Sequence, residues 1–174
     1  APGAEAGEVC RDTNSSRSVT DATLSATGSL CPMPITDAHV GRTYPATPPY
    51  RVNREKIAEF AAALGDANPA YTGDAPQAPP TFAAVLAAQA WEGLFADPEL
   101  DLQLARTIHA DQRFAWTRPL RDGDEVTATL SIDKVRARAN TAFITVSVAL
   151  DTTAGEPVVT ATSTLLHTWP KEDA

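Results

Sequence analysis

The chain has 174 residues, of which 43% are hydrophobic and 21% are charged, and its formal net charge is −8. This composition is typical of a globular protein with room for one domain core and hardly for two. The excess of acidic residues argues against nucleic acid or an anionic membrane as a partner, and no apolar run is long enough to span a bilayer.

The N-terminal segment differs in character from the rest of the chain. Residues 1–32 are rich in Ala, Ser, Thr and Gly and lack a sustained apolar period, which predicts a flexible extension before a domain over 33–174. Either it is a genuine disordered arm, or the natural start is Met33, the only methionine. The segment has neither the basic start nor the apolar block of a secretory signal. Its cysteines, Cys10 and Cys31, are interpreted as incidental thiols of a cytoplasmic protein.

A Pro-rich stretch and a helix are predicted next. RTYPATPPYRV, residues 42–52, suits an edge strand or an extended lead-in. In NREKIAEFAAALG, Asn53 is a helix cap and Gly65 ends the helix. The apolar residues between them repeat at helical spacing: Ile57, Phe60, Ala61 and Leu64. We expect this helix, Asn53 to Leu64, to be the one that the sheet encloses.

A second helix is predicted over TFAAVLAAQAWEGLFA, residues 81–96. Thr81 can cap its start, and Asp97-Pro98 stops it. Because the segment is Ala-rich and apolar around much of its girth, it should be largely buried.

The rest of the chain is predicted to be strand. In TIHADQRFAW, strict alternation places Gln112 on the face of Ile108 and Phe114, and places His109 on the opposite face. Three further alternating segments follow: EVTATLSID, FITVSVAL and VVTATSTLLHTW. An extended segment, two helices and a four-strand antiparallel meander give an α+β fold, in which a curved sheet wraps a helix.

Three segments in this order are similar to one known superfamily. GRTYPATPPYRVNREKIAEFAAALGDANPAY, APPTF and QRFAWTRPLRDGDEV resemble the MaoC-like (R)-specific hydratases and dehydratases of hot-dog fold. The closer resemblance is to the actinobacterial branch of small (3R)-hydroxyacyl-thioester dehydratase subunits, and it extends from about Val40 to Trp169. It implies a single hot-dog domain with an antiparallel sheet around a central helix.

The resemblance also implies a catalytic turn with one member changed. Catalytic members have an Asp and a His in a GD-x-NP-x-H turn, which here maps to Asp66, to Asn68-Pro69 and, in place of the His, to Tyr71. Dehydration of a 3-hydroxyacyl thioester needs a base for the C2 proton and an acid for the leaving hydroxyl group. A tyrosine titrates near ~10 and is a poor base at neutral pH. We expect Asp66 to bond its own turn and the Tyr71 hydroxyl to bond a backbone group.

Candidate substrate-binding residues follow from the same segments. In the family a helix N-terminus holds the thioester carbonyl, so Thr81 and Phe82 are candidates by resemblance. Arginines match the phosphates of acyl carrier protein or coenzyme A, although a solvated turn balanced by acidic residues explains them equally well. The full set of candidates is Asn68, Thr81, Phe82, Gln112, Arg118 and Arg121.

The sequence therefore predicts a subunit of a (3R)-hydroxyacyl-thioester dehydratase or hydratase that lacks the catalytic His. Its expected partners are an acyl thioester, of acyl carrier protein or coenzyme A, and either a MaoC-like hot-dog subunit or a second copy of the chain. Two alternatives stay open: a homodimeric hydratase with an altered base, and a hot-dog protein that binds acyl thioesters or lipid without catalysis. No metal cluster or phosphate loop is present in the sequence, and we expect no cofactor or metal.

Overall fold

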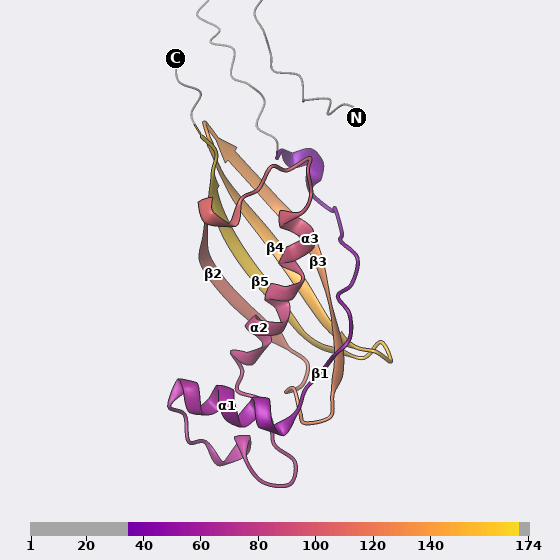
Figure 1. The fold of residues 1–174 in the computed structure, drawn as a ribbon. Helices are drawn as coiled ribbons and strands as arrows, with labels where there is room; N and C mark the ends of the chain where they lie inside the picture. Colours follow the sequence, from indigo (N-terminus) through magenta and orange to yellow (C-terminus); the bar gives the residue numbers. More distant parts are fainter. Residues whose placement is uncertain (1–34, 171–174) are drawn as a thin grey trace, which may run out of the picture. The chain divides into compact units, whose positions relative to one another are not determined.

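A curled antiparallel sheet with helices on its inner side forms the part of the chain that the structure describes, residues 35–170 of a computed structural model (Figure 1). The predicted extension over residues 1–32 lies outside the described residues. The strands are β1 (Tyr50–Arg51), β2 (Thr107–Trp116), β3 (Glu125–Arg138), β4 (Thr141–Thr152) and β5 (Pro157–Thr168). The α-helices are α1 (Arg54–Leu64), α2 (Phe82–Gln89) and α3 (Trp91–Phe95), and three 3₁₀ turns are η1 (Asp37–His39), η2 (Pro69–Tyr71) and η3 (Leu104–Arg106). The α+β class and the single hot-dog domain are confirmed.

The strand order differs from the predicted meander. The order in the sheet is β1-β3-β4-β5-β2, with every pairing antiparallel. β3, β4 and β5 are joined as successive hairpins, whereas β2 crosses to the far side and pairs with β5. Alternation along a strand reports which face is buried and not which strand is its neighbour, so the meander prediction was wrong for β2.

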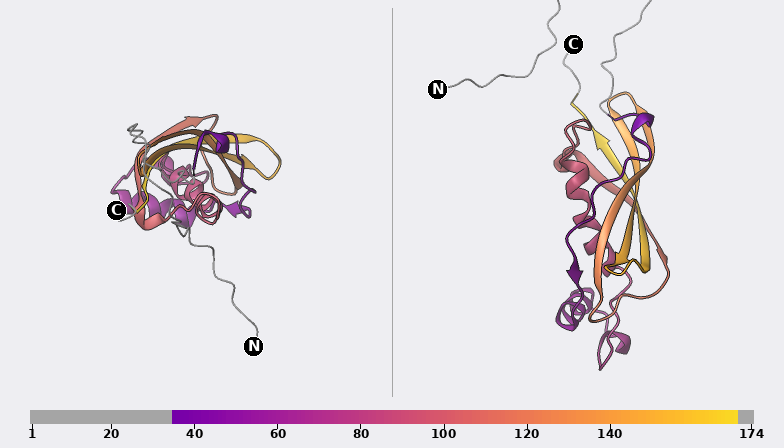
Figure 2. Two further views of the ribbon diagram at one scale, coloured as in Figure 1. Left: turned by 90° about the horizontal axis from the view of Figure 1, so that it is seen from above. Right: turned by 90° about the vertical axis from the view of Figure 1, so that its right-hand side faces the viewer.

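The helix that the sheet encloses is α2, not the predicted Asn53–Leu64 helix. The sheet curls around α2 and α3, and α1 lies at the end of the sheet (Figure 2). α2 contacts β3, β4 and β5. Its small buried side chains, Ala83 and Ala87, allow the helix to approach the strands closely. The second helix was predicted to be largely buried, and α2 does bury Phe82, Ala83, Leu86 and Ala87, although Val85 on its other side is exposed.

Local signals fix α1 as expected. The side chain of Asn53 accepts a hydrogen bond from Lys56 N at 2.8 Å, and Gly65 ends the helix with φ of 67°. The helix buries Ile57 and Ala61, while Phe60 packs edge-on against Phe82 of α2 at 5.2 Å between ring centroids.

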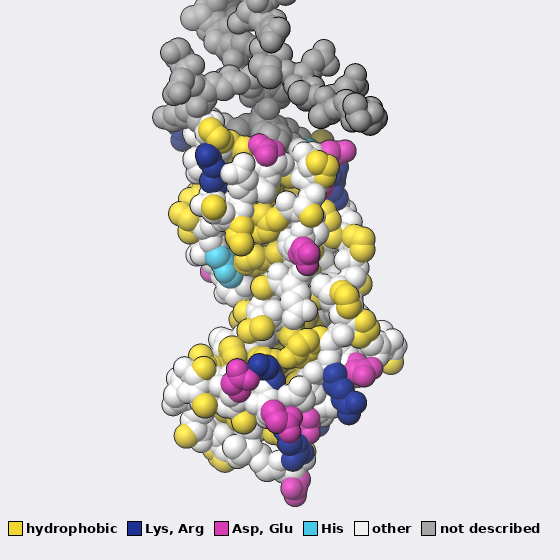
Figure 3. Space-filling view, viewed as in Figure 1, with side chains coloured by type: hydrophobic (Ala, Val, Ile, Leu, Met, Phe, Trp, Pro, Cys, Tyr) yellow, Lys and Arg dark blue, Asp and Glu magenta, His cyan; other side chains and the backbone are white. Residues whose placement is uncertain are grey.

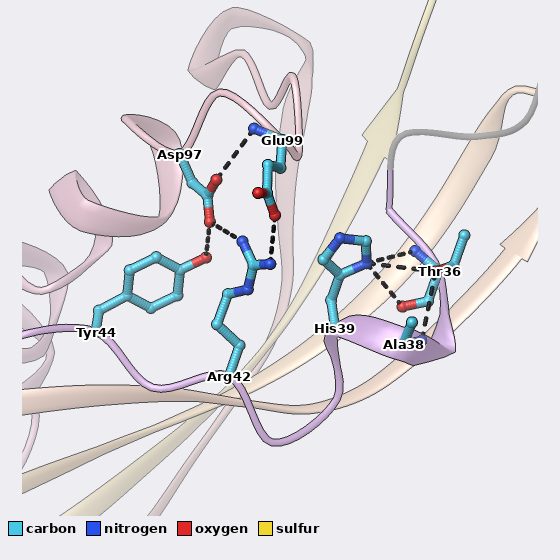
Figure 4. A network of polar contacts seen from close by, with 7 residues as sticks. All are labelled: Thr36, Ala38, His39, Arg42, Tyr44, Asp97 and Glu99. Atoms are coloured by element: carbon cyan, nitrogen blue, oxygen red, sulfur yellow. Dashed lines mark hydrogen bonds and ion pairs between the residues drawn. The ribbon is translucent and has the colours of Figure 1, made fainter.

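The Pro-rich lead-in runs along the edge of β3 as an extended strap. Gly41 N, Tyr44 N and Thr47 N donate to carbonyl groups of β3, and β1 continues the pairing. An ion-pair cluster ties the strap to the segment after α3 (Figure 4): Arg42 binds Asp97 at 2.6 Å and Glu99 at 2.5 Å. The expected edge strand is confirmed, and the strap covers one side of α3.

Candidate functional site

The turn after α1 is built by short side chains that bind their own backbone. Gly65 takes the left-handed conformation, and Asp66 Oδ1 accepts a hydrogen bond from Asn68 N at 3.1 Å. Asn68 Oδ1 in turn accepts from Ala70 N at 3.0 Å, which starts the turn η2 at Pro69. These two successive Asx turns bring Tyr71 back toward Asp66.

Asp66 and Tyr71 are directly hydrogen-bonded. The Tyr71 hydroxyl donates to Asp66 Oδ2 at 3.2 Å, so the prediction of a backbone partner for this hydroxyl was wrong. Tyr71 is buried, with 8% of its surface exposed. Burial raises the pKa of Tyr71, and the hydrogen bond to the Asp66 carboxylate raises it further. The phenol is therefore held in its protonated form at neutral pH, as a donor to Asp66.

The pair borders an open depression of about 480 Å³. Its walls come from α1 and the following turn, and four of its nine lining residues are alanines. The lining residues are Ala58, Ala61, Ala62, Gly65, Asp66, Ala67, Asn68, Tyr71 and Thr72. Asn68 and the Asp66–Tyr71 pair thus line one depression.

The start of α2 lies beside a different depression, of about 290 Å³. Thr81 occupies the N-cap position, but its side chain makes no capping hydrogen bond, contrary to the prediction. Phe82 N donates to Pro79 O at 2.9 Å, and the Phe82 side chain is buried. The Thr81 N–H has no hydrogen-bond partner among residues 35–170. Of the two candidates, Thr81 therefore offers the free donor at this helix end.

The arginines of the same region differ in availability. Arg118 lines the second depression together with Pro80 and Trp116, but its guanidinium binds Asp124 at 2.7 Å and Glu156 at 3.1 Å. Hydrogen bonds from both carboxylates raise the pKa of Arg118 above its ordinary value. Of the two explanations left open for the arginines, the balanced turn holds for Arg118. Arg121 is exposed, and its side chain makes no ion pair with any described residue.

Gln112 is tied to the neighbouring strand. Its amide nitrogen donates to Thr162 O at 3.1 Å, and its amide oxygen accepts from the buried Ser163 hydroxyl at 2.8 Å. Both ends of the amide are thereby used to fasten β2 to β5. The Gln112 side chain therefore links β2 to β5 on the inner face of the sheet.

A β-bulge brings His109 to the inner face, which strict alternation did not predict. The register between β2 and β5 shifts between His109 and Asp111, so the residues before and after the bulge alternate out of phase. His109 therefore stacks edge-on against Trp91 of α3, with 5.0 Å between ring centroids, and Ile108 faces outward. Nothing in the sequence marks the extra residue, so this placement was beyond reach.

Two further observations concern metal binding and membrane insertion of the described residues. Within residues 35–170, no group of three or more His, Cys, Asp or Glu side chains is arranged to hold a metal ion. None of the helices in this range combines the length and the apolar character that a membrane crossing requires.

Comparison with known proteins identifies the family to which the chain is related. A UPF0336 protein of Cutibacterium acnes is 58% identical over 142 residues, which are 82% of this chain and all of that protein. A crystal structure of the C-terminally truncated HadBC (3R-hydroxyacyl-ACP dehydratase) complex from Mycobacterium tuberculosis is similar with a TM-score of 0.65 and 28% identity, over 75% of this chain and 98% of that one. The ChsH1-ChsH2 complex of the same organism shares the fold, with a TM-score of 0.58 and 19% identity, over 72% of this chain and 89% of that one. Residues 38–161 match the family described as "FAS1-like, dehydratase domain region", and the chain belongs to this family.

Proposed function

We propose that the chain is the substrate-binding subunit of a (3R)-hydroxyacyl-thioester dehydratase or hydratase, and that a partner hot-dog subunit supplies the catalytic Asp–His pair. The observation that carries the proposal is the Asp66–Tyr71 hydrogen bond, which joins the two residues to which the resemblance maps the family's catalytic pair.

The chemistry of this pair favours a silent site. Removal of the C2 proton needs a group that is free to accept a proton near neutral pH. Tyr71 is a protonated donor, and each oxygen of Asp66 already accepts a hydrogen bond, one from Tyr71 and one from Asn68 N. The protonated Tyr71 cannot take up the C2 proton, and among the described residues no histidine is hydrogen-bonded to Asp66 to complete an acid–base pair.

The substrate-binding half of the proposal rests on the start of α2. The free Thr81 N–H is a donor suited to a thioester carbonyl, and the depression of about 290 Å³ beside it has Trp116 and Pro80 in its wall. Arg121 is the exposed cation that we assign to a phosphate of the carrier or of coenzyme A. The Phe82 side chain fixes this end of α2 on the core by packing edge-on against Phe60 of α1.

The need for a partner has independent support. Hydrophobic side chains gather beside α2 and α3 on the helix-bearing face (Figure 3). Val85 of α2 is 45% exposed. An apolar strip of this kind is typical of a surface that a second subunit covers. Two of the similar solved structures are complexes by their descriptions, HadBC and ChsH1-ChsH2.

The test is hydration of a crotonyl thioester, measured for the chain alone and with a co-purified hot-dog subunit that carries the Asp–His pair. We expect turnover only in the complex, and loss of turnover when the partner's histidine is replaced by alanine. Loss of a general acid–base group typically lowers the rate ~100- to 10,000-fold. In the chain alone, Tyr71→His is expected to restore part of the activity.

Two outcomes would contradict the proposal. Robust turnover by the chain alone, abolished by Asp66→Asn, would identify a homodimeric hydratase with an altered base. Thioester binding without turnover, in the presence or absence of the partner, would instead identify a binding protein for acyl thioesters or lipids.

A further inference from the structure

The outer face of the sheet, turned away from α2, carries one apolar row. Arg136 of β3 lies opposite Phe143 of β4, Phe143 lies opposite Leu166 of β5, and Leu166 lies opposite Ile108 of β2. These register pairs form a continuous line across four strands. Since neighbouring strands are about 4.8 Å apart, the three apolar side chains extend over roughly 10 Å.

Two of the three apolar residues of this row are unusually exposed, and the third, Leu166, is half-buried. Ile108 is 62% exposed and Phe143 is 48% exposed. The next outward positions of β4, Thr145 and Ser147, are polar, as is usual for the solvated face of an antiparallel sheet. A large aromatic side chain that a central strand leaves half in water is typical of an interaction surface.

Two free cations border the aromatic end of the row. A depression of about 330 Å³ is lined by Lys134, Arg136, Phe143, Thr145 and Thr164. Neither Lys134 nor Arg136 makes an ion pair with any residue of the described range, whereas Arg42, Arg54 and Arg118 are all paired with carboxylates. Lys134 and Arg136 therefore place two positive charges beside the apolar row, in a chain with a formal charge of −8.

We propose that this row and its two cations, which we call the outer patch (Ile108, Lys134, Arg136, Phe143 and Leu166), bind an acidic protein surface. The partner would present an apolar side chain to Phe143 and Leu166, and carboxylates to Lys134 and Arg136. The outer patch lies on the opposite side of the sheet from α2, so the proposal does not depend on the dehydratase function.

Other occupants fit the outer patch less well. The row crosses four strands and continues beyond the depression, which suits a macromolecule better than a small ligand. The net charge of −8 opposes an extended polyanion, such as an anionic membrane or nucleic acid, more than it opposes a protein whose carboxylates are confined to the area facing Lys134 and Arg136. A second copy docked through the same patch about a two-fold axis would bring like charges together, because Lys134 and Arg136 occur in both copies.

The test uses a fluorescent amphipathic peptide with one face of Leu and Phe bordered by Glu, and measures its binding to the full chain by anisotropy. We expect saturable binding that weakens with salt, and no comparable binding of the same peptide with Lys in place of Glu. Lys134→Glu combined with Arg136→Glu, and Phe143→Ser alone, should each weaken binding about tenfold or more.

Matched controls separate the outer patch from general charge and apolar effects. Arg51→Glu reverses an exposed cation at the opposite end of β3, and Leu64→Ser removes an exposed leucine on α1. Both should change binding by less than about twofold. Backbone amide chemical shifts of the unmutated chain should move at Ile108, Phe143 and Leu166 on addition of the peptide.

Four results would overturn the proposal: no binding of the acidic peptide, equal losses in patch and control variants, chemical-shift changes confined to α2, or comparable affinity for the Lys peptide. Flotation with phosphatidylglycerol vesicles, lost in Phe143→Ser, would identify a membrane surface instead. Self-association lost in the same variant would identify a second copy.

Discussion

Asp97 is the side chain that holds the strap in place. Its Oδ2 accepts from Arg42 and from the Tyr44 hydroxyl, at 2.6 and 2.8 Å, and its Oδ1 accepts from Glu99 N at 3.1 Å (Figure 4). Burial by itself would raise the pKa of Asp97, but these hydrogen bonds outweigh it and lower the pKa. The network therefore stabilises the fold at any pH above 3.8, the ordinary pKa of an Asp side chain. This contribution is lost as the pH falls from 3.8 through the lowered pKa of Asp97.

Tyr44→Phe tests this network at one atom. The change removes the hydroxyl bond to Asp97 and keeps the ring, which packs against Gly93. We expect a loss of about 1 kcal/mol in the free energy of unfolding, measured with urea at neutral pH. Glu99→Gln is the control, because Glu99 is 64% exposed and its pairing should contribute less than about 0.5 kcal/mol. A cost for Glu99→Gln equal to that for Tyr44→Phe would contradict this assignment.

His167 is a fully buried histidine whose tautomer follows from its neighbours. The Thr107 hydroxyl donates to Gln103 O and lies 2.8 Å from His167 Nδ1, so Nδ1 must carry the proton that Thr107 accepts. Nε2 then keeps a lone pair, and it has no hydrogen-bond partner among the described residues. Burial lowers the pKa of His167, so the folded protein keeps this ring neutral.

This histidine should make the fold sensitive to mild acid. Below pH 6.5, the ordinary pKa of histidine, the unfolded chain binds a proton at His167 that the folded chain does not bind. The free energy of unfolding is therefore highest above pH 6.5 and falls as the pH is lowered toward the depressed pKa of His167. We expect His167→Asn, which can still donate to Thr107, to flatten this part of the curve of unfolding free energy against pH. Identical slopes for both proteins would rule out His167 as the sensor.

Residues that act on their own turn could be predicted from the sequence, and residues that depend on distant neighbours could not. Asn53 and Gly65 bound α1 as expected, because capping needs only the adjacent backbone. The Tyr71 partner and the ion pair of Arg118 with Glu156 depend on how the chain folds back on itself. The position of His109 depends on a bulge that has no sequence signal.

At the scale of the elements, the helices and strands could be predicted from the sequence, but their positions in the fold could be predicted less well. Apolar period identified α1, and the Ala-rich composition between a start and a stop signal identified α2. These signals could not show that the sheet would curl around α2 and not α1, because that arrangement depends on how closely the alanines of α2 can approach the strands. The neighbour of β2 is likewise set by the whole sheet, and not by the pattern of β2 itself.

Two glycines offer a test at the level of the helices. Gly65 has φ of 67° with open space around it, so Gly65→Ala should cost about 1 kcal/mol from backbone strain alone. Gly93 lies within α3 and has no positive φ, and a Cβ there would meet the Tyr44 ring at 3.4 Å. The helix preference of alanine favours Gly93→Ala by up to about 1 kcal/mol. Thermal unfolding of both variants should therefore differ in sign, and equal destabilisation would contradict this account.

At the scale of the molecule, an open sheet edge and an apolar strip both favour binding of a partner subunit. β2 is an edge strand of ten residues, with β5 on one side and no strand among residues 35–170 on the other. The apolar strip beside α2 and α3 lies on the helix-bearing face of the sheet (Figure 3). A second hot-dog subunit, or a second copy in its absence, would cover both and would close the substrate site at the shared boundary.

Val85→Arg tests this arrangement. Val85 is the exposed valine of α2, 45% exposed, and a charge there would be buried without a partner in any dimer that covers the strip. We expect sedimentation velocity to find the unmutated chain as a dimer, and Val85→Arg to weaken association about tenfold or more. Leu64→Arg is the matched control, because Leu64 is 52% exposed at the end of α1. A monomer at all concentrations, even with the partner subunit, would require both the dimer and the shared substrate site to be abandoned.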